Sequence, residues 1–384
     1  MSIRVGVRVG VIGIHGFSRT HLTQFLARHA AGDCTLVGAV AHERAKDEAY
    51  ATELEAKGVR LVPDLDALLA LGPDLVSVPL GIHLHLPVTE KLLAAGVAVY
   101  LEKPVAGSVA EVDRLIALEQ RAGKPVIVGF QDLFQPAIRD LKQRLVGGLL
   151  GRITAIDVAV GWPRPHAYYA RNGWAGKLKV GDAWVRDSIA NNACAHFLNV
   201  ALFLAGSTED RSAQPATVTA ELGRGNRIES FDTCSLTTAT ADGPVVRFTA
   251  SHLGTETIGP RIRVTGERGA VTADNLEVGT PWMLPDGSRI ESGPRYEVPY
   301  RHALAFLRGA QVPVCRLHHA RPHTVVIEAA HTAGPIADLP GCIDDGQQVR
   351  HPRMDEALRL AHEKGITLAQ TGLVPGLVPA TLRA

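Results

Sequence analysis

The feature that most constrains the fold is a strand, a glycine turn and a helix near the N-terminus. Residues 5–14 are rich in Val and Gly, and residues 20–29 repeat apolar side chains at helical spacing. The turn between them reads Gly13-Ile14-His15-Gly16-Phe17-Ser18. A strand, turn and helix in this order typically open a sheet in which parallel strands alternate with helices.

The alternation continues to about residue 130. Short apolar runs predict further strands, and helical stretches separate them. The predicted strands are 36–40, 59–62, 75–78, 97–101 and 126–129, and the predicted helices are 45–57, 87–95 and 109–122. Right-handed crossovers between parallel strands give an α/β fold with a doubly wound sheet. We therefore predict a Rossmann domain for dinucleotide binding over residues 1–130.

After residue 130 the pattern changes to alternation with a period of two, which indicates antiparallel strands. The predicted strands are 152–160, 216–222, 235–239, 245–252 and 261–265, and the predicted helices are 136–145, 300–308, 323–334 and 354–364. These elements predict an α+β domain over residues 131–384, built on a large, mostly antiparallel sheet with a C-terminal helix. Because an exposed sheet tends to pair with another subunit, we expect a homodimer or homotetramer.

Composition excludes several classes of partner. The 384 residues carry a net charge of +1, with 46% hydrophobic and 21% charged residues, so no overall charge favours nucleic acid or an anionic membrane. No apolar run reaches the length of a membrane span. Five scattered cysteines without a CxxC pair predict reduced thiols in a cytoplasmic protein. No pattern has the spacing of a metal site, and we expect no metal.

The glycine turn is a candidate site for the pyrophosphate of a dinucleotide, because a helix N-terminus presents free backbone N–H groups and a positive dipole end. Gly13 permits the tight turn. A full GxGxxG motif would have glycine where His15 and Ser18 stand, so a glycine turn without a nucleotide is the alternative. The predicted cofactor contacts in this turn are Gly13, His15, Gly16, Phe17 and Ser18.

The residues after the second strand bear on the choice of cofactor. His42 and Arg44 are suited to pair with a 2′-phosphate, which favours NADP, whereas Glu43 suits the free ribose hydroxyl of NAD. They are equally well explained as exposed polar residues at the start of a helix. The sequence predicts NAD or NADP without choosing between them.

Two further loops follow later parallel strands, at the edge of the sheet where ligands bind. Pro79 and His83 follow the fourth strand, and Glu102-Lys103-Pro104 follows the fifth. Pro79, His83 and Glu102 are further candidate cofactor contacts, and the Lys103–Pro104 bond is a candidate cis peptide. The alternatives are a surface turn for the Glu-Lys-Pro segment and an ordinary polar loop for His83.

A third group of polar residues lies at 184–199. A helix from about Ser188 would place Asn192 and His196 four residues apart on one face, which Asn199 would continue. The alternative is a helix capped by Asp187 or Ser188 with a buried His196. Tyr169, Trp174 and Asn191 offer aromatic and amide groups of the kind that contact sugar rings, although they are equally suited to a core.

Together these residues resemble the Gfo/Idh/MocA family over roughly residues 5–340. The resemblance implies a Rossmann domain joined to an α+β domain with a large open sheet. It also implies that Lys103, in the Glu-Lys-Pro motif, and His196, on the second-domain helix, act at the hydride-transfer site. The family usually has an aspartate four residues before that histidine. Here that position is Asn192, which orients a substrate but is not a general base.

We therefore expect hydride transfer between NAD or NADP and a sugar or cyclitol hydroxyl or ketone. Lys103 or His196 would remove the hydroxyl proton, and an imidazole suits this role because it titrates near neutral pH. One alternative is a tightly bound cofactor used transiently in elimination, hydrolysis or epimerisation of a sugar derivative. Another is a non-catalytic sensor or regulatory protein.

Overall fold

The computed structural model describes residues 6–384, and contacts between Cα atoms divide the chain into two compact units. The first unit comprises residues up to 106, then 110–134 and 295–317; the second comprises 107–109, 135–294 and 318–384. The return of 295–317 to the first unit differs from the expectation, which placed all residues after 130 in one domain.

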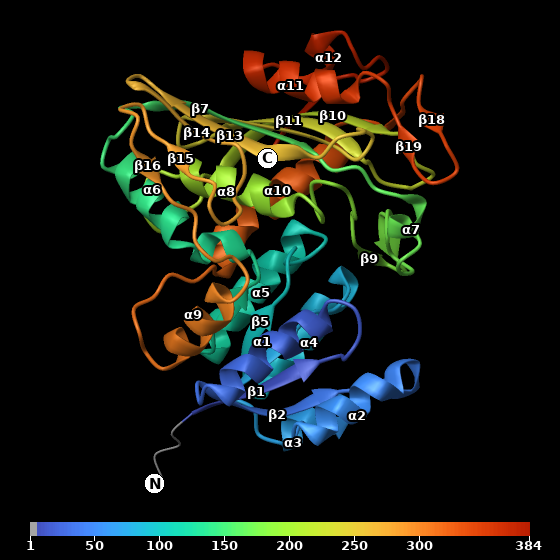
Figure 1. The fold of residues 1–384 in the computed structure, drawn as a ribbon, viewed down its shortest axis with the longest axis vertical. Coiled ribbons are helices and arrows are strands. Elements are labelled where there is room, and N and C mark those ends of the chain that lie inside the picture. The colour runs from blue at the N-terminus through green and yellow to red at the C-terminus, as the bar shows by residue number, and fades with distance from the viewer. Residues whose placement is uncertain (1–5) are drawn as a thin grey trace. The chain divides into compact units, whose positions relative to one another are not determined.

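Within the described residues, the first unit contains a six-stranded parallel sheet in the order β3-β2-β1-β4-β5-β6 (Figure 1). α1 packs against β1 and β2, and α4 packs against β4 and β5. The expected strand over 5–14 begins outside the described residues; the structure has it at Val7–Ile12. The strands are β1 (Val7–Ile12), β2 (Cys34–Val40), β3 (Leu61–Val62), β4 (Leu75–Val78), β5 (Ala98–Leu101) and β6 (Val126–Val128). The helices are α1 (Ser18–Ala30), α2 (Glu48–Ala56), α3 (Leu65–Ala70), α4 (His85–Ala94), α5 (Val109–Ala122) and α9 (Val298–Leu307).

The segment 295–317 is held in the first unit by a buried ion pair and by aromatic packing. Arg295 lies 2.7 Å from Asp132, and both side chains are buried. Tyr300 of α9 stacks on Tyr100 of β5 with ring centroids 5.2 Å apart. The sequence of this helix shows only an apolar face, which does not reveal which sheet it covers. Its place in the first unit is therefore decided by tertiary contacts and not by its local sequence.

The second unit is built on a ten-stranded sheet within the described residues, in the order β16-β15-β14-β13-β7-β12-β11-β10-β17, with β20 also paired to β10. Most pairs are antiparallel, whereas β7 with β12 and β10 with β17 are parallel. The strands are β7 (Ile153–Gly161), β8 (Lys179–Val180), β9 (Ala183–Trp184), β10 (Pro215–Arg224), β11 (Thr233–Thr240), β12 (Val245–Ser251), β13 (Ile258–Gly266), β14 (Gly269–Ala273), β15 (Trp282–Met283), β16 (Arg289–Ile290), β17 (Ala337–Asp338), β18 (Ile343–Asp344), β19 (Val349–Arg350) and β20 (Ala380–Arg383). The helices are α6 (Pro136–Val146), α7 (His166–Tyr169), α8 (Ala195–Ala205), α10 (Leu317–Ala333), α11 (Met354–Lys364) and α12 (Leu368–Thr371).

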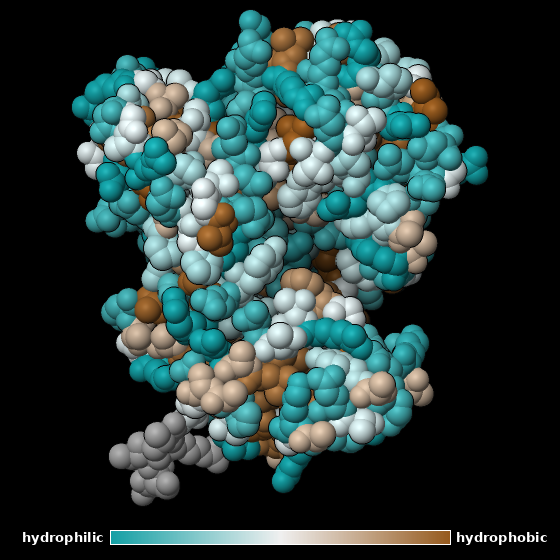
Figure 2. Space-filling model, in the orientation of Figure 1, coloured by the Kyte–Doolittle hydropathy of each residue, from teal (hydrophilic) through white to brown (hydrophobic). Residues whose placement is uncertain are grey.

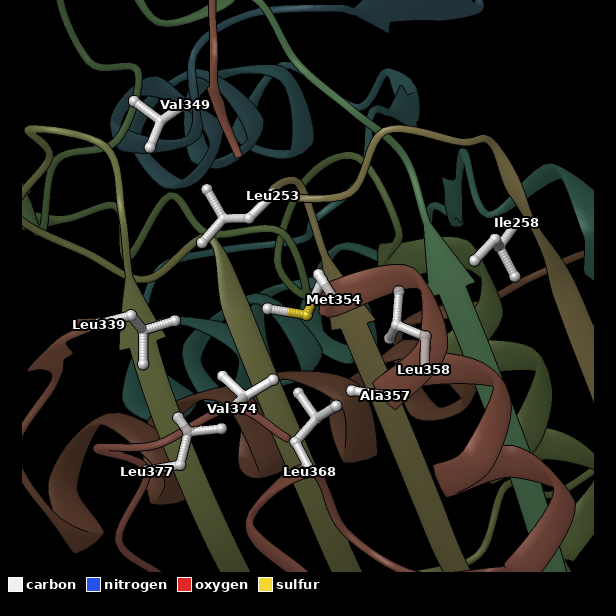
Figure 3. Packing of buried hydrophobic residues seen from close by; sticks show 10 residues of the cluster. All are labelled: Leu253, Ile258, Leu339, Val349, Met354, Ala357, Leu358, Leu368, Val374 and Leu377. Carbon is white, nitrogen blue, oxygen red and sulfur yellow. The ribbon is translucent and has the colours of Figure 1, made fainter. Parts of the chain in front are cut away.

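Helices lie on both sides of this sheet: Figure 1 shows α8 and α10 on one side, and α11 and α12 on the other. Both α8 and α11 pack against β7 and β12. Figure 3 shows the hydrophobic cluster beneath α11 and α12, where side chains of the C-terminal segment meet those of the sheet and its loops. The cluster contains Leu253, Ile258, Leu339, Val349, Met354, Ala357, Leu358, Leu368, Val374 and Leu377.

Polar anchors fix the same C-terminal segment to the sheet. The Glu221 carboxylate accepts from the Thr367 hydroxyl at 2.5 Å and from the Ala369 N–H at 3.0 Å. Arg263 donates to the His362 carbonyl at 2.6 Å, at the end of α11. The C-terminal segment thus covers part of the sheet that we expected to be exposed, at β7 and β12.

On the face that Figure 2 shows, hydrophilic residues predominate, with smaller groups of hydrophobic residues between them. No helix in the described part of the chain combines the length and the apolarity needed to cross a membrane.

Candidate active site

The glycine turn lies where β1 ends and α1 begins. Gly13 has φ +91° and Gly16 has φ +54°, a region that glycine adopts without strain. A Cβ on Gly13 would come within 2.6 Å of the Ser18 hydroxyl oxygen, so glycine is needed there, whereas the space beside Gly16 is open. The first turn of α1 has no acidic residue. No carboxylate in this turn would repel an anion, while the Ser18, Arg19 and Thr20 N–H groups already donate to the carbonyls of residues 15–17 at 3.0–3.2 Å.

The residues after β2 are engaged with their neighbours. The Arg44 guanidinium lies 2.8 Å from Glu48 and 2.6 Å from Glu55, and the hydrogen bonds that it donates to Glu55 and Glu48 raise its pKa. Lys46 lies 2.6 Å from Glu43, and the Glu43 carbonyl contacts the His15 ring at 2.9 Å. Two carboxylates thus compensate the charge of Arg44. His42 is exposed.

A buried histidine that sequence reasoning missed connects three elements of the first unit. His21 of α1 lies 2.6 Å from the Ser77 hydroxyl of β4 and 3.1 Å from a carboxylate oxygen of Glu102, just after β5. The other oxygen of Glu102 accepts from the backbone N–H of Lys103 at 3.1 Å. His21 and Glu102 are both buried. This network fixes the backbone from which the Lys103 side chain extends.

A second missed histidine joins the two loops after β4 and β5. The ring of His85 is fully buried and contacts the carbonyls of Pro104 at 3.0 Å and Leu80 at 3.0 Å. Burial lowers the pKa of His85, and the contacts with the carbonyl oxygens oppose that shift. The Lys103–Pro104 peptide bond is cis, as the sequence suggested. His83 is half-buried, and its Nδ1 has no hydrogen-bond partner among the described residues.

In the second unit, α8 presents one side chain to a partly open environment. Every residue of α8 is buried except His196, in the first turn of the helix. The helix starts at Ala195, so the expected start near Ser188 is wrong, and Asn192 does not share a helical face with His196. Residues 189–194 form turns, because side chains there compete for the backbone. Ser188 Oγ accepts from the Asn191 N–H at 3.2 Å, and Asn191 Nδ2 donates to the Val185 carbonyl at 3.0 Å.

A carboxylate that sequence reasoning considered only as a helix cap contacts Asn192. Asp187, whose exposed fraction is 3%, accepts from Asn192 Nδ2 at 2.7 Å and from the Gly176 N–H at 2.6 Å. Arg171 lies 3.7 Å from the same carboxylate. Asp187 therefore orients the amide of Asn192 and connects it to the segment after α7.

The aromatic residues after β7 form a cluster with cations. The Arg171 guanidinium lies 3.8 Å from the Tyr168 ring centroid and 5.5 Å from that of Trp174, which is half-buried. Tyr169 packs edge-on against Tyr168 and lines a cavity of about 290 Å³. The Tyr169 hydroxyl is buried and has no hydrogen-bond partner among the described residues. Burial raises the pKa of Tyr169, so its hydroxyl stays protonated.

These two units define a class: a dinucleotide-binding oxidoreductase with a second domain built on a large sheet. The sequence model of the "Oxidoreductase family, NAD-binding Rossmann fold" matches residues 7–130, and the model of the "GFO/IDH/MocA C-terminal domain" matches residues 138–272. The chain belongs to the Gfo/Idh/MocA family.

Curated relatives and solved structures agree with this membership. Myo-inositol dehydrogenase Hyg17 of Streptomyces leeuwenhoekii is 37% identical over 26% of this chain and 30% of its own length. Inositol 2-dehydrogenase of Rhizobium meliloti is 24% identical over 77% of this chain and 82% of its own length. The WlbA dehydrogenase from Bordetella pertussis, in complex with NADH and UDP-GlcNAcA, superimposes with a TM-score of 0.71 at 23% identity, covering 85% of this chain and 95% of its own. Three curated relatives match over only 30–45% of their length.

The residues present fit a nicotinamide dinucleotide. The open space beside Gly16 admits a phosphate close to the backbone, and the unsatisfied Nδ1 of His83 is a polar atom suited to a ligand. The two loops after β4 and β5 follow neighbouring parallel strands, so their backbones meet at one edge of the sheet.

Proposed function

We propose that this chain is a dehydrogenase that oxidises a hydroxyl of a sugar or cyclitol, or reduces the corresponding ketone, with a nicotinamide cofactor. The observation that carries the proposal is His196, the one residue of α8 that is not buried. A half-buried imidazole in the first turn of an otherwise buried helix suits contact with a ligand, and the family resemblance implies that a histidine here acts on the substrate. Relatives named as inositol and UDP-N-acetylglucosamine dehydrogenases support this substrate class.

In this proposal Lys103 and His196 act on the same substrate hydroxyl. The bound nicotinamide accepts or donates the hydride. His196 removes the hydroxyl proton, and the Lys103 ammonium stabilises the negative charge that develops on oxygen. Asn192, oriented by Asp187, donates or accepts a hydrogen bond to the substrate. Tyr169, Trp174 and Asn191 are proposed substrate contacts, although Asn191 already uses its amide nitrogen on the backbone.

Among the proposed cofactor contacts, Gly13, Gly16, Phe17 and Ser18 hold the pyrophosphate at the start of α1. His15, His42, Pro79, His83 and Glu102 complete the cofactor site in this proposal. We propose NAD as the preferred cofactor, because Glu48 and Glu55 compensate the charge of Arg44 that a 2′-phosphate would need.

A screen of sugars and cyclitols with NAD and NADP, followed by absorbance of the reduced nicotinamide, tests the activity. On an identified substrate, Lys103→Ala and His196→Ala should each lower kcat by about 10²–10⁴. NAD affinity measured by calorimetry verifies that each variant is folded. Wild-type turnover in both variants would refute the assignment. Cofactor that co-purifies without net NADH production would favour the alternative of elimination, hydrolysis or epimerisation.

A cytoplasmic location and a homodimer or homotetramer complete the proposal. None of the five cysteines, all within the described residues, forms a disulfide, which supports a reducing compartment. Light scattering coupled to size-exclusion chromatography measures the oligomeric state.

A further inference from the structure

Two histidines and an aspartate meet on the second unit, in a cluster that the sequence patterns did not single out. Asp210 lies in the loop between α8 and β10, and His318 and His319 lie in the first turn of α10. One ligand atom from each of the three residues lies within 4.8 Å of the others. None of these residues belongs to the proposed active site.

The distances within the cluster are close to those of a shared ion. His319 Nε2 lies 2.9 Å from one carboxylate oxygen of Asp210, and His318 Nε2 lies 3.9 Å from the other. The two imidazole centroids are 3.9 Å apart. Tetrahedral zinc with ligands at about 2.0–2.1 Å separates its ligand atoms by roughly 3.3 Å. The side chains of His318 and Asp210 are 52% and 75% exposed, which leaves them room to rotate toward this spacing.

The fold already holds the less mobile part of the cluster in place. The His319 side chain is 1% exposed and packs edge-on against Phe203 of α8, with ring centroids 5.8 Å apart. Ser212 donates to the His319 carbonyl at 2.9 Å, and the Ala213 N–H donates to the Leu202 carbonyl at 2.8 Å. The loop that carries Asp210 is thus fixed to both helices, so little further ordering is needed to bind an ion.

The charges around the cluster bear on how strongly it would hold a cation. Arg139 opposes a cation, because its guanidinium lies 3.5 Å from Asp210. Its repulsion limits the affinity and provides a test of the site.

We propose that Asp210, His318 and His319 form a binding site for a divalent transition-metal ion, with zinc as the best fit. Two imidazoles and one carboxylate are the donors that Zn²⁺ and Co²⁺ prefer over Mg²⁺ or Ca²⁺. Solvent completes the coordination. An ion bound here would replace the hydrogen bond between His319 and Asp210, and the His319 ring would then carry its hydrogen on Nδ1. Bound metal fastens the loop between α8 and β10 to the start of α10.

The test uses the full chain, freed of any affinity tag and treated with a chelator. Titration with Co²⁺, followed by its visible absorbance, and displacement by Zn²⁺ should give one site per chain. Asp210→Asn and His318→Gln should each weaken Zn²⁺ binding at least tenfold in calorimetry. Arg139→Gln should strengthen binding by about fourfold, because it removes a nearby positive charge.

His166 provides the matched control, since it also lies 2.9 Å from an aspartate, Asp344, but without a second imidazole. His166→Gln should leave the stoichiometry and affinity unchanged. Absence of a bound ion, or equal losses in His166→Gln and His318→Gln, would overturn the proposal. Circular dichroism and NAD binding verify that the variants are folded. His166→Gln and His318→Gln are expected to stay folded because these side chains are 42% and 52% exposed.

Discussion

The carboxylate of Asp187 accepts a hydrogen bond from the side-chain amide of Asn192 at 2.7 Å. The family usually has an aspartate where this chain has Asn192, and here a buried carboxylate instead lies directly beside that position. An amide and a carboxylate form a neutral-to-charged hydrogen bond, whereas two carboxylates at this distance would repel each other. We therefore expect that Asp187 and Asn192 can be exchanged for each other only when both are changed together.

We predict that Asn192→Asp alone destabilises the chain by about 1–3 kcal/mol, because two carboxylates would then be in contact. The exchange Asp187→Asn with Asn192→Asp should recover most of that loss, since the hydrogen bond forms again with its partners reversed. Urea denaturation of Asp187→Asn, Asn192→Asp and the double variant measures the coupling free energy between the two residues. Equal stability of Asn192→Asp and the exchange would contradict the pairing.

His21 is predicted to be a major stabilising residue of the first unit. His21→Leu leaves the buried Glu102 carboxylate and the Ser77 hydroxyl without their imidazole partner. We expect a loss of about 3–5 kcal/mol in the free energy of unfolding, as for a buried pair broken on one side. His29→Gln, at an exposed position of the same helix, should cost less than about 1 kcal/mol. Similar losses in the two variants would exclude the proposed network.

The cofactor preference should follow the ion pairs of Arg44. We expect the wild-type chain to use NAD at least tenfold better than NADP, as the ratio of kcat/KM. Glu48→Gln combined with Glu55→Gln frees the Arg44 guanidinium, so the ratio should shift toward NADP by about tenfold, or roughly 1.4 kcal/mol. Adding Arg44→Ala to the double variant serves as the control. If the shift in preference toward NADP persists in this triple variant, a residue other than Arg44 causes it.

Stability should fall in mild acid because two buried imidazoles are neutral in the folded chain. Burial lowers the pKa of His252 to about 3 and that of His319 to about 4, whereas an imidazole in the unfolded chain titrates near 6.5. Below pH 6.5 the unfolded chain takes up protons that the folded chain does not. Stability is therefore lost as the pH falls from 6.5 toward 4, by up to about 1.4 kcal/mol per pH unit for each ring.

Urea denaturation at several pH values measures this slope. His252→Gln, in which an amide replaces the ring that contacts the Trp162 carbonyl, should flatten it. His29→Gln should leave the slope unchanged, because His29 is exposed and belongs to the first unit, whereas His252 and His319 belong to the second. A slope that does not respond to His252→Gln would show that other groups control the acid sensitivity.

The sequence predicted the parts of the fold that local patterns control. The glycine turn depends on the positive φ values of Gly13 and Gly16. The Lys103–Pro104 peptide bond is cis, as expected. The alternation of strands and helices to residue 130 matches the parallel sheet. The roles of Lys103 and His196 remain predictions, since they depend on the bound substrate.

The remaining features depend on partners distant in sequence. The start of α8 was placed too early because Ser188 and Asn191 bond to nearby backbone groups, an arrangement that helical spacing does not reveal. His21 and His85 were missed because a lone histidine in an apolar helix shows nothing of its partners. The adjacent His318 and His319 could be recognised as possible metal ligands only in the fold, which places Asp210 beside them.

The position of α11 and α12 over one side of the ten-stranded sheet has a consequence for biosynthesis. β10 pairs with β20, and the hydrophobic cluster under α11 draws on residues from 253 to 377. During translation β10–β12 emerge well before the residues that shield them. The nascent second unit therefore carries an unshielded apolar β surface until its last segment is released, and this interval is when the chain is most exposed to aggregation and most in need of a chaperone.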